Sequence, residues 1–375
     1  MARRSVAGWR ARWHAWRDRL LGDPRFQRWA ADFPLTRPLA QRRARELFDL
    51  CAGFVYSQIL FACVELDLFS RLRAAPLDAA ELAAATDLTP AAAERLLRAA
   101  VALRLLERRG DGRFGLGPHG AALLGHPGVA AMVRHHALLY RDLAAPLALL
   151  RGTADTELKR FWAYVGTDDP RQNDGQAVGA YSELMTASQT LVADDTLDAY
   201  PLARHRCLLD LGGGEGHFVV AAAQRWPSLR ALIFDLPAVA ARANARLAAL
   251  GLTERLQAHG GDLFRDPLPP GADLVSLVRV LHDHDDAPAL AILRAARAAL
   301  PTGGTLLISE PMSETPGAEP VGDAYFGFYL LAMGSGRPRP PRELIAMLTA
   351  AGFGAARLLP TRRPLLTRVL VAQAT

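Results

Sequence analysis

The stretch Arg206-Cys-Leu-Leu-Asp-Leu-Gly-Gly-Gly-Glu-Gly216 decides the fold of this chain. An apolar run ends there in an acidic residue and then breaks into four glycines within five positions. This pattern is typical of a buried strand that leads into a ligand-binding turn, and a helix is expected to follow over 221–225. Glycines allow positive φ angles and a close approach of the backbone to a ligand. The expected ligand contacts are Asp210, Gly212, Gly214 and Gly216.

The spacing of these glycines distinguishes between cofactors. A dinucleotide-binding turn needs G-x-G-x-x-G, but the two positions where its last glycine would stand are His217 and Val219. The pattern Asp-x-Gly-x-Gly-x-Gly instead resembles the first motif of methyltransferases that use S-adenosylmethionine (SAM). A glycine turn alone is weak evidence, because many tight strand-to-helix turns contain glycine. The neighbouring strands must therefore support the interpretation.

The chain from about residue 205 onward alternates between strand and helix patterns. This alternation predicts βαβ units and a doubly wound parallel sheet. A polar Pro/Gly loop is expected at 313–322 and an Arg-Pro run stands at 337–342. Strands are expected over 206–211, 229–234, 273–280, 305–309 and 367–372, with a short one ending at 260–262, and helices over 238–250, 287–300 and 342–351.

Two acidic residues follow the next two predicted strands. Asp235 stands at a strand end, where a carboxylate can accept hydrogen bonds from both ribose hydroxyls. Asp262 follows the third strand and can receive an adenine amino group while Leu263 packs on the ring. Alternatively, Asp235 caps the next helix, which Pro237 disfavours, and Asp262 belongs to an ordinary turn. Because ligands bind at the carboxyl ends of strands in open α/β sheets, the glycine turn and these residues together predict one nucleoside site.

The fourth strand ends in the densest polar cluster of the chain, Arg279-Val-Leu-His-Asp-His-Asp-Asp286. His282 is the candidate general base, because an imidazole can take up a proton near neutral pH and such catalysis contributes about 10²–10⁴-fold in rate. Asp283 or Asp285 can orient it. A metal site is the alternative, but two histidines spaced i, i+2 at a strand end point apart, so we assign no metal. Asp285 and Asp286 also suit the start of the helix at 287.

Length and composition bound the class of protein. The chain has 375 residues, half of them hydrophobic, which suffices for two domains with cores of their own. We find neither an unbroken apolar run of about 18 residues nor a signal-peptide pattern, so a cytoplasmic protein is expected. The three cysteines show no C-x-x-C spacing, which argues against disulfides and a zinc site.

The first 45 residues form a basic arm. Residues 1–50 hold twelve arginines and five acids, a balance of +7, against +6 for the whole chain. The balance predicts an anionic partner, either a membrane surface or a nucleic acid. An interfacial helix within residues 1–30 suits a membrane, and packing on a partner subunit is the alternative. One apolar stripe at helical spacing carries this prediction: Val6, Trp9, Trp13, Trp16 and Leu20.

Residues 46–200 are predicted to be a helical domain, before a third domain over 201–375. The run 46–72 is apolar on nearly every face, which predicts a helix buried between neighbours or subunits. Helix patterns at 78–86 and 89–103 and a hairpin at 105–114 indicate a winged helix. Winged helices commonly read DNA, but the second helix is too apolar for a major groove, so a dimer surface and no nucleic acid are expected. Residues 120–200 look mostly helical.

These motifs together resemble the small-molecule O-methyltransferases that include the plant caffeic acid and flavonoid enzymes, over residues 46–375. The resemblance implies a Rossmann-like C-terminal domain, a winged-helix dimerisation domain, a homodimer and SAM as the cofactor. The motifs that carry it are the glycine turn, Phe234-Asp-Leu-Pro237, Gly260-Gly-Asp-Leu-Phe264, Leu281-His-Asp-x-Asp-Asp286 and Gly303-Gly-Thr-Leu-Leu-Ile-Ser-Glu310.

The resemblance also implies roles for single residues. His282 matches the family's catalytic base and Glu310 one of two glutamates that flank it. The second glutamate position falls near Pro338 and is not acidic here, which puts in doubt any mechanism that needs both carboxylates. The remaining correspondences are Asp235 for the ribose, Asp262 and Leu263 for the adenine, Arg279 for a cofactor contact, and Met185 with Ser188 or Gln189 for the substrate pocket.

Within this family, the Trp-rich arm, Phe26-Gln-Arg-Trp29, the segment 47–58 and the His-Asp-His-Asp-Asp cluster are similar to the carotenoid enzymes of purple bacteria. That similarity implies a lipophilic substrate, methylated on the tertiary hydroxyl of an acyclic carotenoid. A phenolic or polyketide substrate is the alternative within the same chemistry. A SAM-sensing winged-helix regulator is the alternative from another functional class.

Overall fold

The computed structural model describes residues 2–162, 189 and 191–375. The chain divides into two compact units, one up to Ala121 and one over Ala122–Thr375. The sequence had placed a boundary at 200/201 and grouped residues 122–200 with the helical domain. The described helices between 127 and 161 instead belong to the C-terminal unit.

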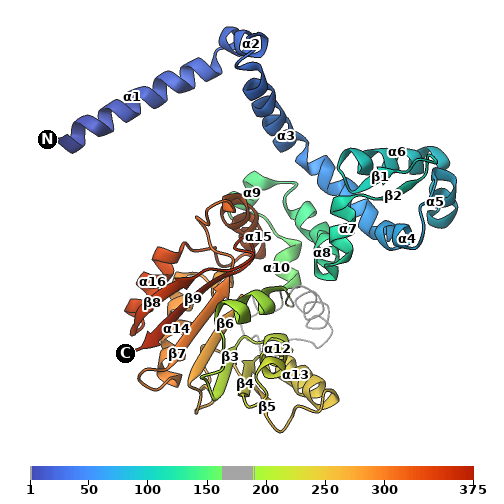
Figure 1. Ribbon diagram of the computed structural model, residues 1–375. Helices are drawn as coiled ribbons and strands as arrows, with labels where there is room; N and C mark the ends of the chain where they lie inside the picture. Colours follow the sequence, from blue (N-terminus) through green and yellow to red (C-terminus); the bar gives the residue numbers. More distant parts are fainter. Residues whose placement is uncertain (1, 163–188, 190) are drawn as a thin grey trace. The chain divides into compact units, whose positions relative to one another are not determined.

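The N-terminal unit is helical apart from one small hairpin (Figure 1). Asp78 caps a short helix through a capping box, and Thr89 caps the next one, as expected for a winged helix. The predicted hairpin pairs Leu106 with Leu116. The elements are α1 (Ala2–Gly22), α2 (Pro24–Asp32), α3 (Arg37–Glu65), α4 (Leu68–Ala74), α5 (Ala79–Thr86), α6 (Pro90–Ala102), β1 (Leu106–Arg108) and β2 (Phe114–Leu116), followed by α7 (Pro118–Leu124).

Helix α3 is exposed along most of its length in the single chain, which leaves burial between subunits as the form of the prediction that fits. Only its C-terminal end is buried in the single chain, at Cys63 and Val64. Leu50 and Phe54 are 81% and 72% exposed. By length and composition α3 would suffice to cross a membrane. The sequence shows no unbroken apolar run here, because Asp49 and other polar residues interrupt it. The exposed face leaves a large apolar surface for a partner.

A seven-stranded sheet forms the centre of the C-terminal unit, in the order β5-β4-β3-β6-β7-β9-β8. Five strands are parallel, as predicted, but β9 runs antiparallel to β7, and β8 runs antiparallel to β9. The predicted doubly wound, mostly parallel sheet is therefore confirmed, and its two antiparallel strand pairs lie at one edge. The strands are β3 (Cys207–Leu211), β4 (Arg230–Asp235), β5 (Leu256–Gly260), β6 (Leu274–Val278), β7 (Thr305–Glu310), β8 (Phe353–Leu359) and β9 (Arg368–Ala374).

Helices cover both faces of this sheet, which explains why β6 and β7 are buried along their whole length. Helices α14 and α16 pack on one face. Helices α12 and α13 and the helical residues 191–199 pack on the other. The bounds are α12 (His217–Arg225), α13 (Pro237–Ala249), the short turn η2 (Leu281–Asp283), α14 (Asp286–Ala299) and α16 (Pro341–Ala350).

A second layer of helices packs over α15 rather than on the sheet. Leu139, Leu158 and Trp162 share an apolar cluster with Tyr329 and Leu330. The segment 313–322, predicted as a polar loop, turns at its end into a π-helical stretch that continues directly as an α-helix. The elements are α8 (Pro127–Asp142), α9 (Pro146–Leu150), α10 (Glu157–Phe161), η3 (Pro320–Phe326) and α15 (Gly327–Met333).

Candidate active site

The glycine turn after β3 has the predicted backbone. Gly212, Gly214 and Gly216 have φ angles of 65°, 58° and 78°, in the left-handed region that favours glycine. A Cβ at Gly213 would lie 2.6 Å from Oδ2 of Asp210, so the turn is closely packed from below. Among the residues that the structure describes, no atom lies within 4 Å of a Cβ placed at Gly214. The turn is therefore open on one side only, where a ligand can approach its backbone.

Asp210 supports this turn from beneath. Its side chain is buried, and Ser276 donates a hydrogen bond of 2.5 Å to Oδ1. Burial raises the pKa of Asp210 to about 7. The sequence had grouped Asp210 with the ligand contacts, but the structure places its carboxyl under the turn rather than on the open side.

Asp235 ends β4 beside the same turn. Its Oδ2 accepts the N–H of Gly214 at 2.7 Å, and its Oδ1 accepts the N–H of Leu236 at 2.7 Å. Burial raises the pKa of Asp235 to about 6. Each carboxylate oxygen keeps a further lone pair, so Asp235 can hold the glycine turn and still accept two ribose hydroxyls.

Asp262 follows β5, the neighbour of β4, and its carboxyl is largely buried. Oδ1 accepts the N–H of Phe264 at 2.8 Å, which folds the chain into a turn. Oδ2 lies 3.6 Å from Nε of Arg265, and Leu263 is half-buried next to it. Asp262 therefore forms a turn, and its position also fits the predicted nucleoside site.

His282 lies in the short turn after β6 and is buried. Its Nε2 is 3.2 Å from Oδ1 of Asp283, whereas Nδ1 is buried and has no hydrogen-bond partner in the described part of the chain. Burial, together with the charge of Arg279, lowers the pKa of His282 to about 3. The imidazole is therefore neutral near pH 7 and has a nitrogen ready for a ligand's proton.

Glu310, at the end of β7, contacts the backbone of the histidine rather than its ring. Its Oε2 accepts the N–H of His282 at 3.1 Å, and its Oε1 has no partner among the described residues. Burial raises the pKa of Glu310 to about 8, so the carboxyl is protonated near pH 7. In this structure Glu310 positions the loop, which differs from a glutamate that flanks the imidazole.

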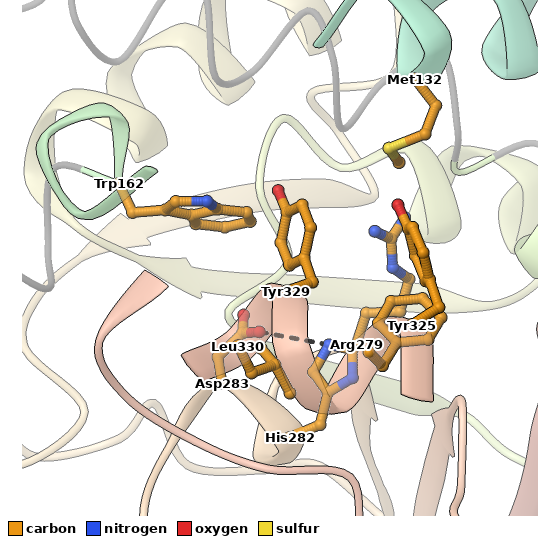
Figure 2. A pocket seen from close by; sticks show the side chains of 9 residues that line it. Met132, Trp162, Arg279, His282, Asp283, Tyr325, Tyr329 and Leu330 are labelled. Atoms are coloured by element: carbon orange, nitrogen blue, oxygen red, sulfur yellow. Dashed lines mark ion pairs between the residues drawn. The ribbon is translucent and has the colours of Figure 1, made fainter. Parts of the chain in front are cut away.

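A small pocket opens above His282 and Asp283, and aromatic side chains line it (Figure 2). Phe326 packs on the imidazole with ring centroids 5.8 Å apart. In Figure 2, Trp162, Tyr329 and Tyr325 surround the same space. The remaining lining residues are Met132, Arg279 and Leu330. Apart from His282, Asp283, Arg279 and the two tyrosine hydroxyls, the described lining is apolar, which suits a largely apolar ligand.

Two histidines of α8 hold the tyrosines of this pocket. His135 Nε2 lies 2.8 Å from the hydroxyl of Tyr329, and His136 Nε2 lies 2.7 Å from that of Tyr325. Sequence reasoning missed these residues, since the loop prediction for 313–322 left the following segment without an assigned role. The i, i+4 spacing of Tyr325 and Tyr329 was the available signal for a helical wall.

The other predicted pocket residues are only partly testable. Met185 and Ser188 lie outside the described residues. Gln189 is half-buried in a helix and its side-chain oxygen is buried without a described partner. Arg279, predicted as a cofactor contact, lines the pocket at a left-handed φ of 59°, and its N–H donates to the carbonyl of Ser309 at 2.8 Å. Such a strained residue is typical of a functional site.

The second histidine of the cluster points elsewhere. His284 packs edge-on against Phe264, with ring centroids 5.4 Å apart. Asp285 accepts the N–H of Gly336, while the carboxylate of Asp286 pairs with Arg337 and a second arginine. Among the residues that the structure describes, no three His, Cys, Asp or Glu side chains gather as a metal-binding group. Asp285 and Asp286 also begin α14, as expected.

Comparison with known proteins places these features in a family. The O-methyltransferase domain model matches residues 140–354, and the O-methyltransferase dimerisation domain model matches residues 48–126. The chain is 44% identical to the demethylspheroidene O-methyltransferase of Cereibacter sphaeroides, over 94% of this chain and 93% of the relative. The enzyme of the same name from Rhodobacter capsulatus is 41% identical, over 91% and 84%.

The fold has a close counterpart among solved structures. Human N-acetylserotonin methyltransferase in complex with SAM superposes with a TM-score of 0.74 at 24% identity, covering 88% of this chain and 97% of that one. The open glycine turn, Asp235 and Asp262 fit the nucleoside of SAM, and the dimerisation domain supports a homodimer. A regulator is not favoured, because the matching family models and relatives are O-methyltransferases. The chain belongs to the SAM-dependent O-methyltransferase family.

Proposed function

We propose that this enzyme methylates the tertiary hydroxyl of an acyclic carotenoid, with His282 as the general base. The carrying observation is the aromatic pocket above His282 and Asp283, which Arg279 also lines. Its aromatic walls suit an apolar chain, and its polar groups suit the one hydroxyl that this chain presents. The two relatives named as demethylspheroidene O-methyltransferases support the same substrate class.

The residues of this chain supply positioning and a proton acceptor. The neutral imidazole, whose Nε2 lies 3.2 Å from Oδ1 of Asp283, accepts the hydroxyl proton. Asp283 then stabilises the imidazolium that forms. SAM, when bound, supplies an activated methyl group, so alignment of the reacting atoms can account for about 7–11 kcal/mol of the barrier.

A general base is important for this reaction because the acceptor is a tertiary alcohol. A tertiary alcohol is much less acidic than a phenol, so its proton must leave as the new bond forms. Burial keeps His282 unprotonated at neutral pH, which preserves its acceptor site. Trp162 and Tyr329 pack edge to face on one side of the pocket.

The substrate assignment is tested by offering labelled SAM with either a hydroxylated acyclic carotenoid or a phenolic acceptor, each dispersed in detergent. We expect label in the carotenoid and little in the phenol. Label in the phenol alone would replace the carotenoid with the phenolic alternative. Label in neither, with SAM binding intact, would contradict both substrate classes.

We further propose that the enzyme is cytoplasmic and docks on the anionic face of a membrane through α1 and α2. Trp9, Trp13 and Trp16 are 67%, 45% and 54% exposed, and the arginines at 10, 12 and 19 flank them with exposed side chains. Tryptophans suit the headgroup level of a bilayer, and each nearby arginine adds about 1 kcal/mol. A carotenoid dissolves in the bilayer, so docking brings the enzyme to its substrate.

Deleting residues 1–30 tests this docking, and changing the three tryptophans to alanine tests it with the arginines in place. We expect both variants to dimerise and to methylate detergent-dispersed carotenoid, but not to co-sediment with anionic liposomes. A lost dimer with unchanged liposome binding would show that the arm packs on the partner subunit instead.

A further inference from the structure

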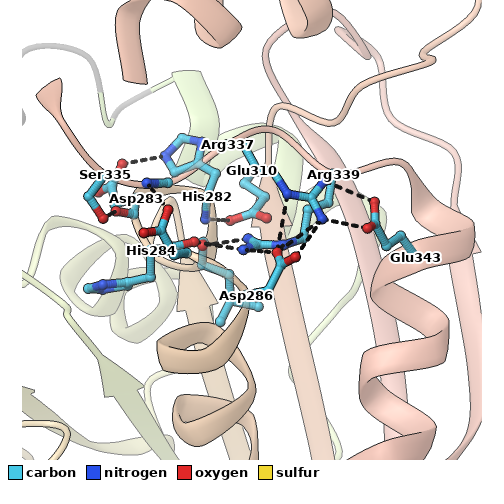
Figure 3. Close-up of polar contacts among 12 residues, drawn as sticks. His282, Asp283, His284, Asp286, Glu310, Ser335, Arg337, Arg339 and Glu343 are labelled. Atoms are coloured by element: carbon cyan, nitrogen blue, oxygen red, sulfur yellow. Dashed lines mark hydrogen bonds and ion pairs between the residues drawn. The ribbon is translucent and has the colours of Figure 1, made fainter. Parts of the chain in front are cut away.

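The backbone that carries His282 is held by a segment more than fifty residues away. Arg339 is completely buried, and Figure 3 shows its guanidinium against the His282 loop, residues 281–286. Its Nη1 donates to the carbonyl of Leu281 at 2.9 Å, and its Nη2 donates to that of His284 at 2.7 Å. The two carbonyls lie on either side of His282, so one rigid side chain spans the catalytic residue.

The charge of this buried arginine is compensated from outside. Oδ1 of Asp286 accepts from Nε of Arg339 at 3.0 Å and from Nη2 at 2.8 Å. Arg337 also pairs with Asp286, and it extends to Glu343 on α16. The charge of Arg339 is therefore paired with Asp286, and its N–H groups donate to Asp286 and to the carbonyls of Leu281 and His284, as a buried ion requires.

The residues just before Arg339 touch the same loop. Ser335 donates to the carbonyl of Asp283 at 3.0 Å, and the N–H of Gly336 donates to Oδ1 of Asp285 at 3.0 Å. Gly336 has a φ of 83°, and a Cβ there would collide with the carbonyl oxygen of His282. Only glycine permits this approach.

From these contacts we infer that Arg339, together with the close approach of Gly336, is the positioning element for His282. Glu310 holds the N–H of His282 from one direction, and Arg339 holds the flanking carbonyls from another. Among the described residues, Asp283, its neighbour in the chain, is the one polar side chain in contact with the ring. Its placement therefore depends on the backbone that these residues fix.

The inference rests on the proposed role of His282 and predicts an effect on chemistry rather than on SAM binding. Arg339→Lys keeps the charge but cannot donate to both carbonyls and to Asp286. A displacement of about 1 Å at a reacting group can cost about 10²-fold. We expect a kcat lower by about 10²-fold, with a dissociation constant for SAM within about twofold of wild type.

Two further variants complete this experiment, one that should show the same loss and one that serves as the control. Gly336→Ala pushes on the carbonyl of His282 with every charge in place, and it should lower kcat in the same way. Arg337→Gln removes an exposed arginine that binds Asp286 and Glu343 but none of the loop carbonyls. Because exposed ion pairs contribute little, we expect less than about a fivefold change in kcat for Arg337→Gln.

The measurement is single-turnover methyl transfer from labelled SAM to whichever acceptor the wild-type enzyme methylates, with SAM binding followed by calorimetry. If Arg339→Lys and Gly336→Ala fold and keep wild-type kcat, Arg339 does not position the base. An equal loss in Arg337→Gln would also overturn the inference. Should Arg339→Lys fail to fold, Gly336→Ala decides alone. If the His282→Ala variant is active, His282 is not the general base, and the proposed positioning role of Arg339 fails with that assignment.

Discussion

The SAM-binding edge and the His282 loop lie at the carboxyl ends of neighbouring strands, but they are stabilised differently. The edge, formed by the glycine turn, Asp235 and Asp262, is held by contacts such as that between Asp235 and Gly214, 21 residues apart. The loop is held by Arg339, which is 58 residues from Leu281. We therefore expect local motifs to encode cofactor binding, whereas the proposed geometry of catalysis depends on a more distant part of the chain.

The largest expected effect separates the two histidines of the loop. His282→Ala should lower kcat by about 10²–10⁴-fold, because the proton acceptor is lost, and should leave SAM binding intact. His284→Ala is the matched control, since its ring packs on Phe264 away from the pocket. Rates from labelled SAM distinguish them. Equal losses in both variants, or restoration of activity by added metal after chelation, would favour a metal site.

The second effect belongs to the SAM-binding edge. Asp235→Ala should weaken SAM binding by about 10–10²-fold, because two charge-assisted hydrogen bonds to the ribose are lost and Gly214 loses its partner. Calorimetry gives the affinity directly. Asp266→Ala removes a nearby carboxylate that accepts the N–H of Asp262. This change should weaken SAM binding less. An unchanged affinity in Asp235→Ala would refute the ribose assignment.

A third, smaller effect concerns stability on the catalytic side. The folded-state pKa of Glu310 is raised to about 8 from its ordinary 4.5, so ionisation opposes folding as pH rises between these values. Glu310→Gln cannot ionise and should gain on the order of 1–3 kcal/mol relative to wild type between pH 5 and 8. Urea unfolding at several pH values measures this gain. A difference that does not vary with pH would contradict the buried, protonated carboxyl.

The smallest effect is the pH dependence of SAM binding. Asp235 has a folded-state pKa raised to about 6, so it is ionised above that pH and protonated below it. The affinity for SAM should therefore fall as pH drops through about 6. In Asp235→Asn the affinity should be lower and nearly constant from pH 5 to 8. A wild-type affinity that is flat over the same range would show that this carboxyl does not titrate in the site.

The sequence predicted the parts of the molecule that have local signatures. The apolar runs at 206–211 and 305–309 became β3 and β7, and the three glycines took the expected positive φ. His282 was found because its cluster is polar at the end of an apolar strand. These features depend on residues close in the sequence, so the sequence alone can predict them.

The features that were missed depend on tertiary contacts. Strand β8 lies at the sheet edge, where only its first residue, Phe353, is buried, and Arg357 within it weakened the apolar pattern. The Pro/Gly composition of 313–322 concealed the π-helical turn that leads to Tyr325. Arg339 stood in an Arg-Pro run that gave no sign of burial, because its partners become visible only in the fold.

The most direct test of the account is a crystal structure of the enzyme with S-adenosylhomocysteine and a hydroxylated acyclic carotenoid. The account predicts the carotenoid hydroxyl within about 2.6–3.2 Å of a ring nitrogen of His282, with Arg339 still bound to the carbonyls of Leu281 and His284. A hydroxyl bound away from this imidazole, in a complex that is competent for transfer, would contradict it.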